Sequence, residues 1–406
     1  MNSNGTTNPP RSAAARRSWQ GAAIWSRGFR PFFLAAGVWA VVGIALWPPF
    51  LSGAIEIPTA FSAVDWHAHE MVFGYGGAVV TGFLLTAIPN WTGRLPIAGR
   101  PLAALTALWA AGRLAIFASS LIGRPAATAI DGAYLIVLAA LVAREVVAGR
   151  NWRNLKVAAL VSALALVNLA FHFEDAWRGT AAYSQRAALA VMVMLILLVG
   201  GRVTPSFTHN WLARVGQAKR PVPFGRSDGA AMALSGASLA LWVVAPDWRW
   251  SGALAVAAGL GNLWRLSRWR GLSARKDPLV LVLHVGFLLA ALGFVTIGAH
   301  ALWPAVVPSA AGVHVWAVGA VGVMTLAMMT RATLGHAGRA LVASTATRLA
   351  YLSVIVAMLA RVGMALLPAF TISLMDVAAG AWILAFAAFL AGYAPMLLRP
   401  VGAAGN

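Results

Sequence analysis

Asp65-Trp66-His67-Ala68-His69-Glu70-Met71 stands where a polar segment becomes a long apolar run that ends at Pro89-Asn90-Trp91-Thr92-Gly93-Arg94. Two imidazoles, two carboxylates and a thioether are costly at the mouth of a membrane helix, so these side chains are candidates for function. A second apolar run begins at His314, and Gly338-Arg339 follows it at the same offsets that separate His69 from Gly93-Arg94. The match indicates that this pattern is repeated.

The composition of the chain indicates that its environment is a membrane. The 406 residues are 60% hydrophobic and only 10% charged, with a mean hydropathy of +0.76. Such a chain cannot cover itself with polar surface as a soluble domain does. Its apolar runs are continuous and about 20 residues long, which suits membrane-spanning helices and not the alternating strands of a barrel. The sequence predicts an all-α polytopic membrane protein with about twelve transmembrane helices, at 31–51, 68–89, 101–122, 128–148, 155–174, 183–203, 229–246, 249–267, 278–302, 310–330, 345–367 and 371–398.

The basic residues predict the topology. If both termini are cytoplasmic, alternate loops on the cytoplasmic side hold 25 of the 31 Lys and Arg residues, as expected for inner loops. We therefore expect a multi-pass membrane protein with both termini cytoplasmic and with the lipid bilayer as partner. The net charge of +20 follows this loop pattern, so it indicates no nucleic acid partner. Residues 1–24 are polar and predicted to be a disordered cytoplasmic tail, and 25–400 form a single transmembrane domain.

The spacing of the histidine- and arginine-bearing spans predicts an internal repeat. Spans two, six and ten recur every four helices, and spans five and nine both end on a histidine. This pattern suggests three four-helix units near 30–150, 155–270 and 278–399. Together they would form a pseudo-threefold bundle with sites between the units.

Histidines are the main candidate metal ligands, because the chain has no cysteine and eight histidines. The predicted spans divide them by side of the membrane. The outer side has His67, His69, His172, His300 and His314, and the inner side has His209, His284 and His336. Imidazole suits copper, zinc and iron, and two facing imidazoles are the usual axial ligands of a b-type haem. Each histidine alone has a simpler interpretation, as a helix cap or a solvated loop residue.

The conformation of the opening stretch decides which of its side chains act together. If 66–71 is helical, His67 and His69 point about 200° apart and cannot share a metal, while His67 lies on one face with Glu70 and Met71. If the segment is extended, both imidazoles point to one side and can chelate one ion. The sequence leaves both alternatives open.

Several segments of the chain resemble the NnrS family. They are the 27–33 segment RGFRPFF, WHAHEM at 66–71 with PNWTGR at 89–94, the 201–210 segment, LHVG at 283–286 and the 329–339 segment. The resemblance covers nearly the whole chain. It implies a bacterial inner-membrane protein that contains haem and copper and belongs to the nitric oxide response, often beside denitrification. The arrangement also resembles the catalytic subunits of haem–copper oxidases and nitric oxide reductases, but Gln185 stands in span six where they would need a histidine.

The histidines are assigned to the two cofactors that the resemblance implies, as a working hypothesis. His69 and His314 are the expected axial haem ligands because of their matched positions, with His284 as the alternative. Copper is expected at His67, His172 and His300, with Met71 and Glu70 beside them, and zinc can use the same ligands. His209 and His336 are weaker candidates. Arginines with nearby Ser or Thr can hold a carboxylate or haem propionate, although anionic lipid would use the same residues, and they are Arg202, Arg331 and Arg339.

Three functions are consistent with these observations. The first is a membrane oxidoreductase that binds or turns over nitric oxide, or relays electrons to it from a quinol or cytochrome donor. The second is a redox sensor or an assembly factor for metal enzymes, without turnover. The third is a transporter that uses the histidines as proton or metal relays. A bound chromophore would argue against the third.

Overall fold

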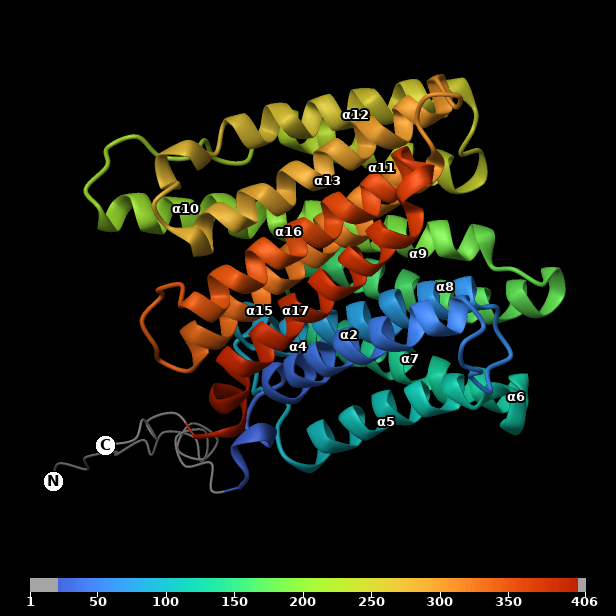
Figure 1. The fold of residues 1–406 in the computed structure, drawn as a ribbon. Coiled ribbons are helices and arrows are strands. Elements are labelled where there is room, and N and C mark those ends of the chain that lie inside the picture. Colours follow the sequence, from blue (N-terminus) through green and yellow to red (C-terminus); the bar gives the residue numbers. More distant parts are fainter. Residues whose placement is uncertain (1–20, 401–406) are drawn as a thin grey trace, which may run out of the picture.

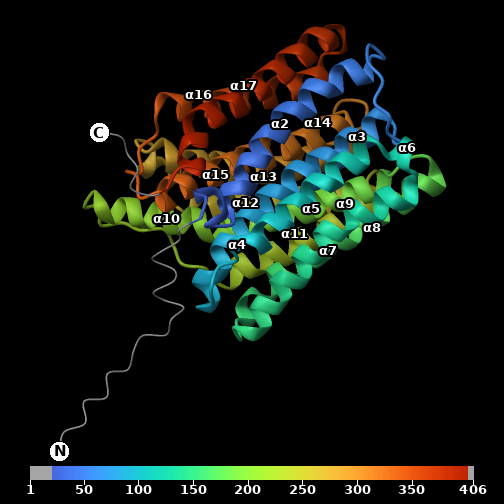
Figure 2. The ribbon, with the colours of Figure 1, turned by 90° about the horizontal axis from the view of Figure 1, so that it is seen from below.

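The computed structural model describes residues 21–400, and this part of the chain is built of helices without strands. Most of the predicted tail, residues 1–20, lies outside the described residues. The long helices lie side by side, with their axes roughly aligned and successive helices running back and forth (Figures 1 and 2). We call the end with loops 52–62 and 303–308 the outer end, and the end with loops 215–225 and 337–344 the inner end. The described chain begins and ends at the inner end.

Helices occupy all twelve predicted segments. Nine of the twelve are single long helices, followed in places by a short turn. They are α2 (Phe29–Leu51), α5 (Arg100–Phe117) with the short α6 (Ser119–Ile122), α7 (Arg124–Ala148), α8 (Leu155–Arg178), α11 (Arg226–Val244), α12 (Arg249–Ser267), α13 (Pro278–Leu302), α16 (Thr345–Leu366) and α17 (Thr371–Leu398). Short 3-10 turns precede or join some of them, at η1 (Ala23–Trp25), η3 (Trp152–Asn154), η5 (Gly271–Ala274) and η7 (Pro368–Phe370).

The other three long helices are interrupted by π-helical turns. They are spans two, six and ten, each built of an outer helix, a π turn and an inner helix. Their segments are α3 (Ala63–His69), η2 (Glu70–Gly76) and α4 (Gly77–Thr92); α9 (Ala182–Leu195), η4 (Ile196–Gly200) and α10 (Gly201–Arg214); α14 (Ser309–His314), η6 (Val315–Gly322) and α15 (Val323–His336). π turns inside helices are rare and are often found at functional sites.

Ten of the described helical segments are long and apolar enough to cross a membrane. The two predicted spans that do not qualify are α5 and α12, and each carries two arginines. Outward-facing leucines and tryptophans are common on the long helices; Leu166 and Leu352 are both more than 60% exposed. A lipid environment accounts for such a surface, because a soluble monomer rarely exposes so much apolar side-chain area.

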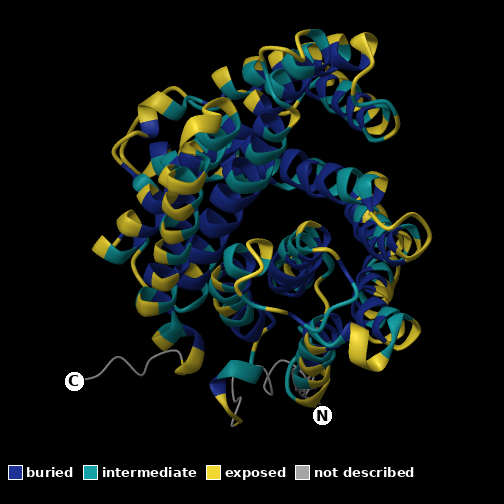
Figure 3. Cartoon of the chain, turned by 45° about the vertical axis from the view of Figure 1, so that its right-hand side comes forward, coloured by how far each residue is buried: buried dark blue, intermediate teal, exposed yellow. Residues whose placement is uncertain are grey.

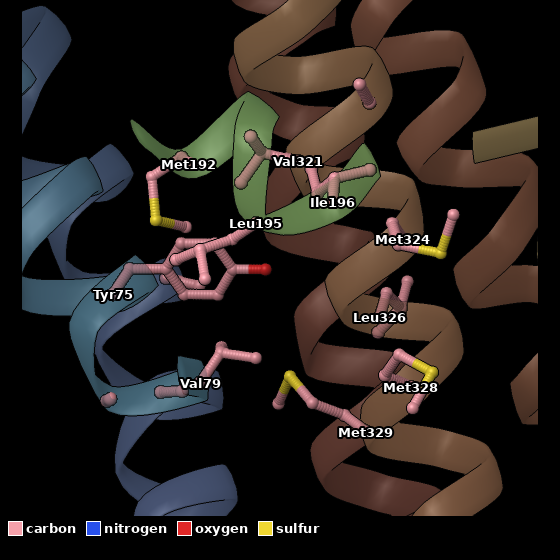
Figure 4. Close-up of a cluster of buried hydrophobic side chains, with 14 of the residues drawn as sticks. Tyr75, Val79, Met192, Leu195, Ile196, Val321, Met324, Leu326, Met328 and Met329 are labelled. Carbon is pink, nitrogen blue, oxygen red and sulfur yellow. The ribbon is translucent and has the colours of Figure 1, made fainter. Parts of the chain in front are cut away.

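The three π-containing helices and α13 are the most buried of the candidate spans. In each of these four, 67–72% of the most apolar segment is buried, whereas the value is 33–44% in the other six candidate spans. Figure 3 shows buried residues, in dark blue, on the inner sides of the helices. Figure 4 shows the centre, where methionines of spans six and ten face Tyr75 and Val79 of span two. The Tyr75 hydroxyl lies 2.5 Å from that of Thr325 and ties span two to span ten. Flexible methionines fill this irregular space between three interrupted helices.

Candidate metal centre

Six polar side chains meet inside the outer half of the bundle. We call them the outer polar cluster. They come from span two and from α5, α7 and α8, and each of the six is buried. They are His69, Glu70, Arg113, Asp131, Asn168 and His172. Ionisable groups at such a depth are costly unless they are paired or functional, which makes this cluster the first candidate for a site.

Asp131 of α7 is the centre of the cluster. Its Oδ2 accepts hydrogen bonds from Asn168 Nδ2 at 2.8 Å and faces His172 Nε2 at 3.0 Å. The same oxygen lies 3.2 Å from His69 Nε2. Its Oδ1 pairs with the Arg113 guanidinium. One carboxylate therefore joins four neighbouring helices.

Glu70 and Arg113 complete the cluster. Glu70 Oε1 lies 3.0 Å from His69 Nδ1 and accepts from Arg113 Nη1 at 2.5 Å. Both ring nitrogens of His69 thus face carboxylates. Two carboxylates and one guanidinium leave one negative charge when both histidines are neutral. Because an uncompensated charge is expensive in this environment, the cluster favours one more cation, either a proton on an imidazole or a metal ion.

Aromatic rings enclose His69. Its ring centroid lies 5.6 Å from that of Phe61, 5.0 Å from that of Phe73 and 5.2 Å from that of Phe171. Phe61 also contacts His172, at 5.5 Å. These rings keep water away from the cluster and thereby strengthen each electrostatic contact within it.

Three members of the cluster have the spacing of a metal site. One ligand atom each from His69, Asp131 and His172 can be chosen so that all three lie within 4.8 Å of one another. Two imidazoles and a carboxylate suit iron, zinc or copper. Glu70 on the other nitrogen of His69 matches the carboxylate that commonly orients a metal-bound histidine. The donor set therefore fits a first-row transition metal.

The conformation at the start of span two determines where His67 and His69 point. Ser62 caps α3 by accepting the Asp65 amide at 3.1 Å, and Asp65 Oδ1 accepts from Gln185 Nε2 at 2.6 Å. The segment is therefore helical when it reaches the histidines. Of the two conformations that the sequence left open, the helical one is found. His67 and His69 consequently face different surroundings.

His67 lies outside the outer polar cluster and borders the same small cavity as His314. Its ring stacks on Trp47 with centroids 4.1 Å apart, and its Nδ1 has no hydrogen-bond partner. It lines a small cavity of about 50 Å³ with His314 and Arg361. His314 Nδ1 lies 2.7 Å from the Ala310 carbonyl, which leaves Nε2 free. The structure thus brings His314 to His67, and His69 to His172.

The remaining predicted histidines have separate environments. His300 lies 2.7 Å from the Val307 carbonyl and 3.1 Å from Asp247, so His67, His172 and His300 have three different sets of neighbours. At the inner end, His284 Nε2 lies 2.8 Å from the Thr208 hydroxyl. His336 stacks on Phe29, and its Nδ1 accepts a hydrogen bond from Arg27 Nη1 at 3.2 Å.

The other predicted side chains lie mostly at the inner end. Arg202 donates to Asn154 Oδ1 at 2.7 Å, whereas Arg331 lies over the Phe207 ring with its Nη1 unpartnered. Arg339 and His209 are exposed. Met71 is half-buried beside Gly43, one helical turn from His67.

Two cavities of about 580 Å³ each open at the inner end, on either side of Arg202. The first lies among α8, α10, α11 and α12, and we call it the basic cavity. The second lies among spans two, six and ten, and we call it the central inner cavity. It is lined by aromatic rings and by Arg202, Arg214, Arg331 and His336. Pockets for small molecules and cofactors have volumes of roughly 300–1,000 Å³. Both inner cavities reach this range, whereas the His67–His314 cavity does not.

Arg113, Asp131 and Asn168 are the site residues that the sequence analysis missed. Each is a polar residue inside an apolar run, and Asp131 and Arg113 are charged. That signal is available in the sequence, because charges inside a span face the bundle interior and pair with one another. Which partners they meet depends on helix rotation, which the sequence does not give.

The fold and the site together define an all-α, multi-span membrane protein with a buried histidine–carboxylate cluster suited to a metal ion. No curated protein matches this chain. The NnrS protein family model matches residues 23–400, and the chain belongs to that family.

Proposed function

We propose that this protein binds a transition-metal ion at its outer polar cluster and a haem at its inner end, and acts with them in the nitric oxide response. The observation that carries the proposal is the buried group of His69, Asp131 and His172, whose donor atoms are spaced for one ion. Copper is the metal that the family resemblance implies, and imidazole donors suit it. Bound metal would supply a redox centre or a Lewis acid for a small ligand.

The residues of the chain have distinct roles in this proposal. His69, His172 and Asp131 hold the ion, and Glu70 fixes the orientation of the His69 ring through its Nδ1. Arg113 bridges Glu70 and Asp131, so that both carboxylates keep their positions. Phe61, Phe73 and Phe171 exclude water. An apolar enclosure also favours a small, weakly polar ligand such as nitric oxide over water.

Haem fits the central inner cavity better than the outer side. Its volume, its aromatic lining and its three guanidinium groups match a flat macrocycle with two propionates. His336 is the histidine that lines this cavity, and Arg331 Nη1 is a buried donor without a partner. The alternative pair, His67 and His314, borders only about 50 Å³. We therefore propose His336 as a haem ligand, with Arg331 and Arg202 holding propionates.

The membrane arrangement is also proposed. Twelve spans with both termini cytoplasmic would result if α5 and α12 cross the bilayer beside their neighbours. α5 packs on α7 and α12 packs on α13, and the axes of both are roughly aligned with the rest of the bundle (Figure 1). The π turns of spans two, six and ten support three repeated four-helix units. An inner-membrane location and a quinol or cytochrome electron donor remain part of this proposal.

Metal analysis and absorption spectra of the purified protein test the two cofactors. We expect His172→Ala to lose most of its metal and to keep its haem absorbance, whereas His336→Ala loses haem absorbance and keeps metal. His300→Ala is the matched control, because His300 also sits near the outer end but belongs to no cluster. Equal metal loss in the His172 and His300 variants would refute the proposed ligand set.

Exposure to nitric oxide tests the function itself. We expect the spectrum of the reduced protein to shift when nitric oxide is added, and membranes containing it to consume nitric oxide when an electron donor is present. A spectral shift without consumption would favour a sensor or assembly factor. A purified protein with neither metal nor haem would overturn the proposal in favour of a transporter.

A further inference from the structure

The basic cavity is distinct from both cofactor sites proposed above. It has a volume of about 580 Å³ and lies among η3, α8, α10, α11 and α12 at the inner end. The loop 221–224 borders it on one side. The lining residues lie between Trp152 and Trp269, so nearly all of them belong to the predicted repeat unit 155–270.

Positive charge dominates the cavity lining. Arg153, Lys156, Arg202 and Arg265 border it, and Asp228 is its one acidic lining residue. Asp228 is already engaged, because it pairs with Arg265 at 3.3 Å and with Arg268 at 3.2 Å. It also accepts the Gly225 amide at 2.9 Å as the cap of α11. The cavity therefore carries an excess of positive charge that Asp228 does not neutralise.

Arg265 borders this cavity and carries an unsatisfied buried donor. Its side chain is fully buried, with Nε toward Asp228 and Nη1 donating to Asn262 Oδ1 at 2.9 Å. Its Nη2 has no partner. A Cβ on Gly201 would stand 2.7 Å from that Nη2, so the glycine leaves the space that the guanidinium uses. Buried guanidinium donors are nearly always paired, which indicates that an acceptor is needed here.

Apolar side chains line the basic cavity beside these charged groups. Trp152, Leu198, Phe224, Met232 and Trp269 line the same cavity. Trp152 and Phe224 are largely exposed, as side chains at the edge of a membrane are. A ligand that fits this lining has an anionic head and an apolar body.

We propose that the basic cavity binds the phosphate headgroup of an anionic phospholipid, with Arg265 Nη2, Arg153 and Lys156 as its donors. Basic pockets between helices near the cytoplasmic surface are suited to such headgroups. The lipid phosphate would supply the missing acceptor, and the acyl chains would cover the tryptophan and leucine side chains. This inference does not depend on the haem or on the metal ion.

Binding to nanodiscs tests the proposal. Delipidated full-length protein is titrated with phosphatidylglycerol in phosphatidylcholine nanodiscs, and the retained lipid is counted by native mass spectrometry. We expect Lys156→Gln to weaken phosphatidylglycerol binding by about fivefold, as expected for one cation at an anionic surface. Gly201→Ala should weaken it as well, since the new methyl group displaces Arg265 Nη2. Arg178→Gln, at the opposite end of α8, is the control and should bind as the wild type does.

The same experiment has outcomes that overturn the proposal. Equal binding of phosphatidylglycerol and phosphatidylcholine would show that the charges select no headgroup. An equal loss in the Arg178 variant would show a general charge effect. If glycerol phosphate competes as well as the lipid, the cavity is a site for a soluble phosphate compound. If Lys156→Gln lowers haem absorbance, the cavity holds haem.

Discussion

Asp131 joins more partners than any other side chain of the outer polar cluster. Arg113, Asn168 and His172 contact it, and His69 lies beside it. Its carboxylate both balances the charge of Arg113 and offers a metal ligand. Removing that charge should therefore affect stability and metal content together.

Asp131→Asn tests this double role, because asparagine keeps the shape and removes the charge. We expect metal affinity to fall by tenfold or more, since even the loss of an outer hydrogen-bond partner costs about 10–100-fold. Breaking the buried pair with Arg113 should also lower stability by about 3–5 kcal/mol. Metal content and thermal unfolding in detergent measure the two effects.

Asp247→Asn is the matched control for that change. Asp247 also contacts a histidine, His300, but its side chain is 80% exposed. An exposed substitution should change stability by less than about 0.5 kcal/mol. If the Asp131 variant behaves like this control in both measurements, the cluster is neither a metal site nor a source of stability.

At this scale the sequence predicted half of the candidate site. His69, His172 and Glu70 stood out because polar residues at the ends of apolar runs are visible in a sequence. Their grouping was not predictable, because His67 and His69 are two residues apart and turn to opposite sides only when the helix is formed. Asp131 was missed because its partners come from other helices.

At the scale of the element, glycines allow the interior helices to approach closely. Gly293 of α13 faces the π turn of span ten, and a Cβ there would lie 2.1 Å from the Trp316 ring. That ring donates its Nε1–H to the Ala290 carbonyl at 2.9 Å. Trp316 therefore has no free direction in which to move.

Gly293→Ala should therefore destabilise the protein by about 1–3 kcal/mol, the usual cost of overpacking. Gly380→Ala in α17 provides the comparison, since a Cβ there meets nothing within 4 Å. Alanine replaces glycine inside a helix with a gain of about 0.5–1 kcal/mol where space allows. Thermal unfolding of both variants in the same detergent distinguishes them. An equal response would show that Trp316 can adjust.

The sequence predicted the helices well and their interruptions not at all. Long apolar runs give the length and number of helices, and all twelve expected segments are helical. The π turns interrupt runs that stay largely apolar, so hydropathy does not mark them. Their positions in spans two, six and ten could be found only in three dimensions.

For the whole molecule, the proposed topology places the outer and inner ends on opposite sides of the membrane. Reporter fusions inserted at Glu56 and at Lys219 should report opposite sides, because these residues lie in loops at opposite ends of the bundle. Glu56 should be periplasmic and Lys219 cytoplasmic, given the excess of basic residues at the inner end. Both reporters on one side would contradict the topology.

The membrane class was predictable from composition alone, since hydropathy and run length depend on no contact. The cavities were not, because each is bounded by side chains from at least three helices. Arg202 illustrates this difference. The sequence indicated an anion-binding arginine, but only the structure shows it standing between two separate cavities.

The outer polar cluster is local in the chain, since all its residues lie between His69 and His172. During synthesis the helices that carry it leave the ribosome before the helices that follow His172. The stretch from 173 to 400, roughly 230 residues, takes on the order of 10–45 s to translate. We expect the nascent chain to gather these groups while its second half is still being made. The charged side chains would then pair early in membrane insertion, and each would spend little time unpaired in lipid.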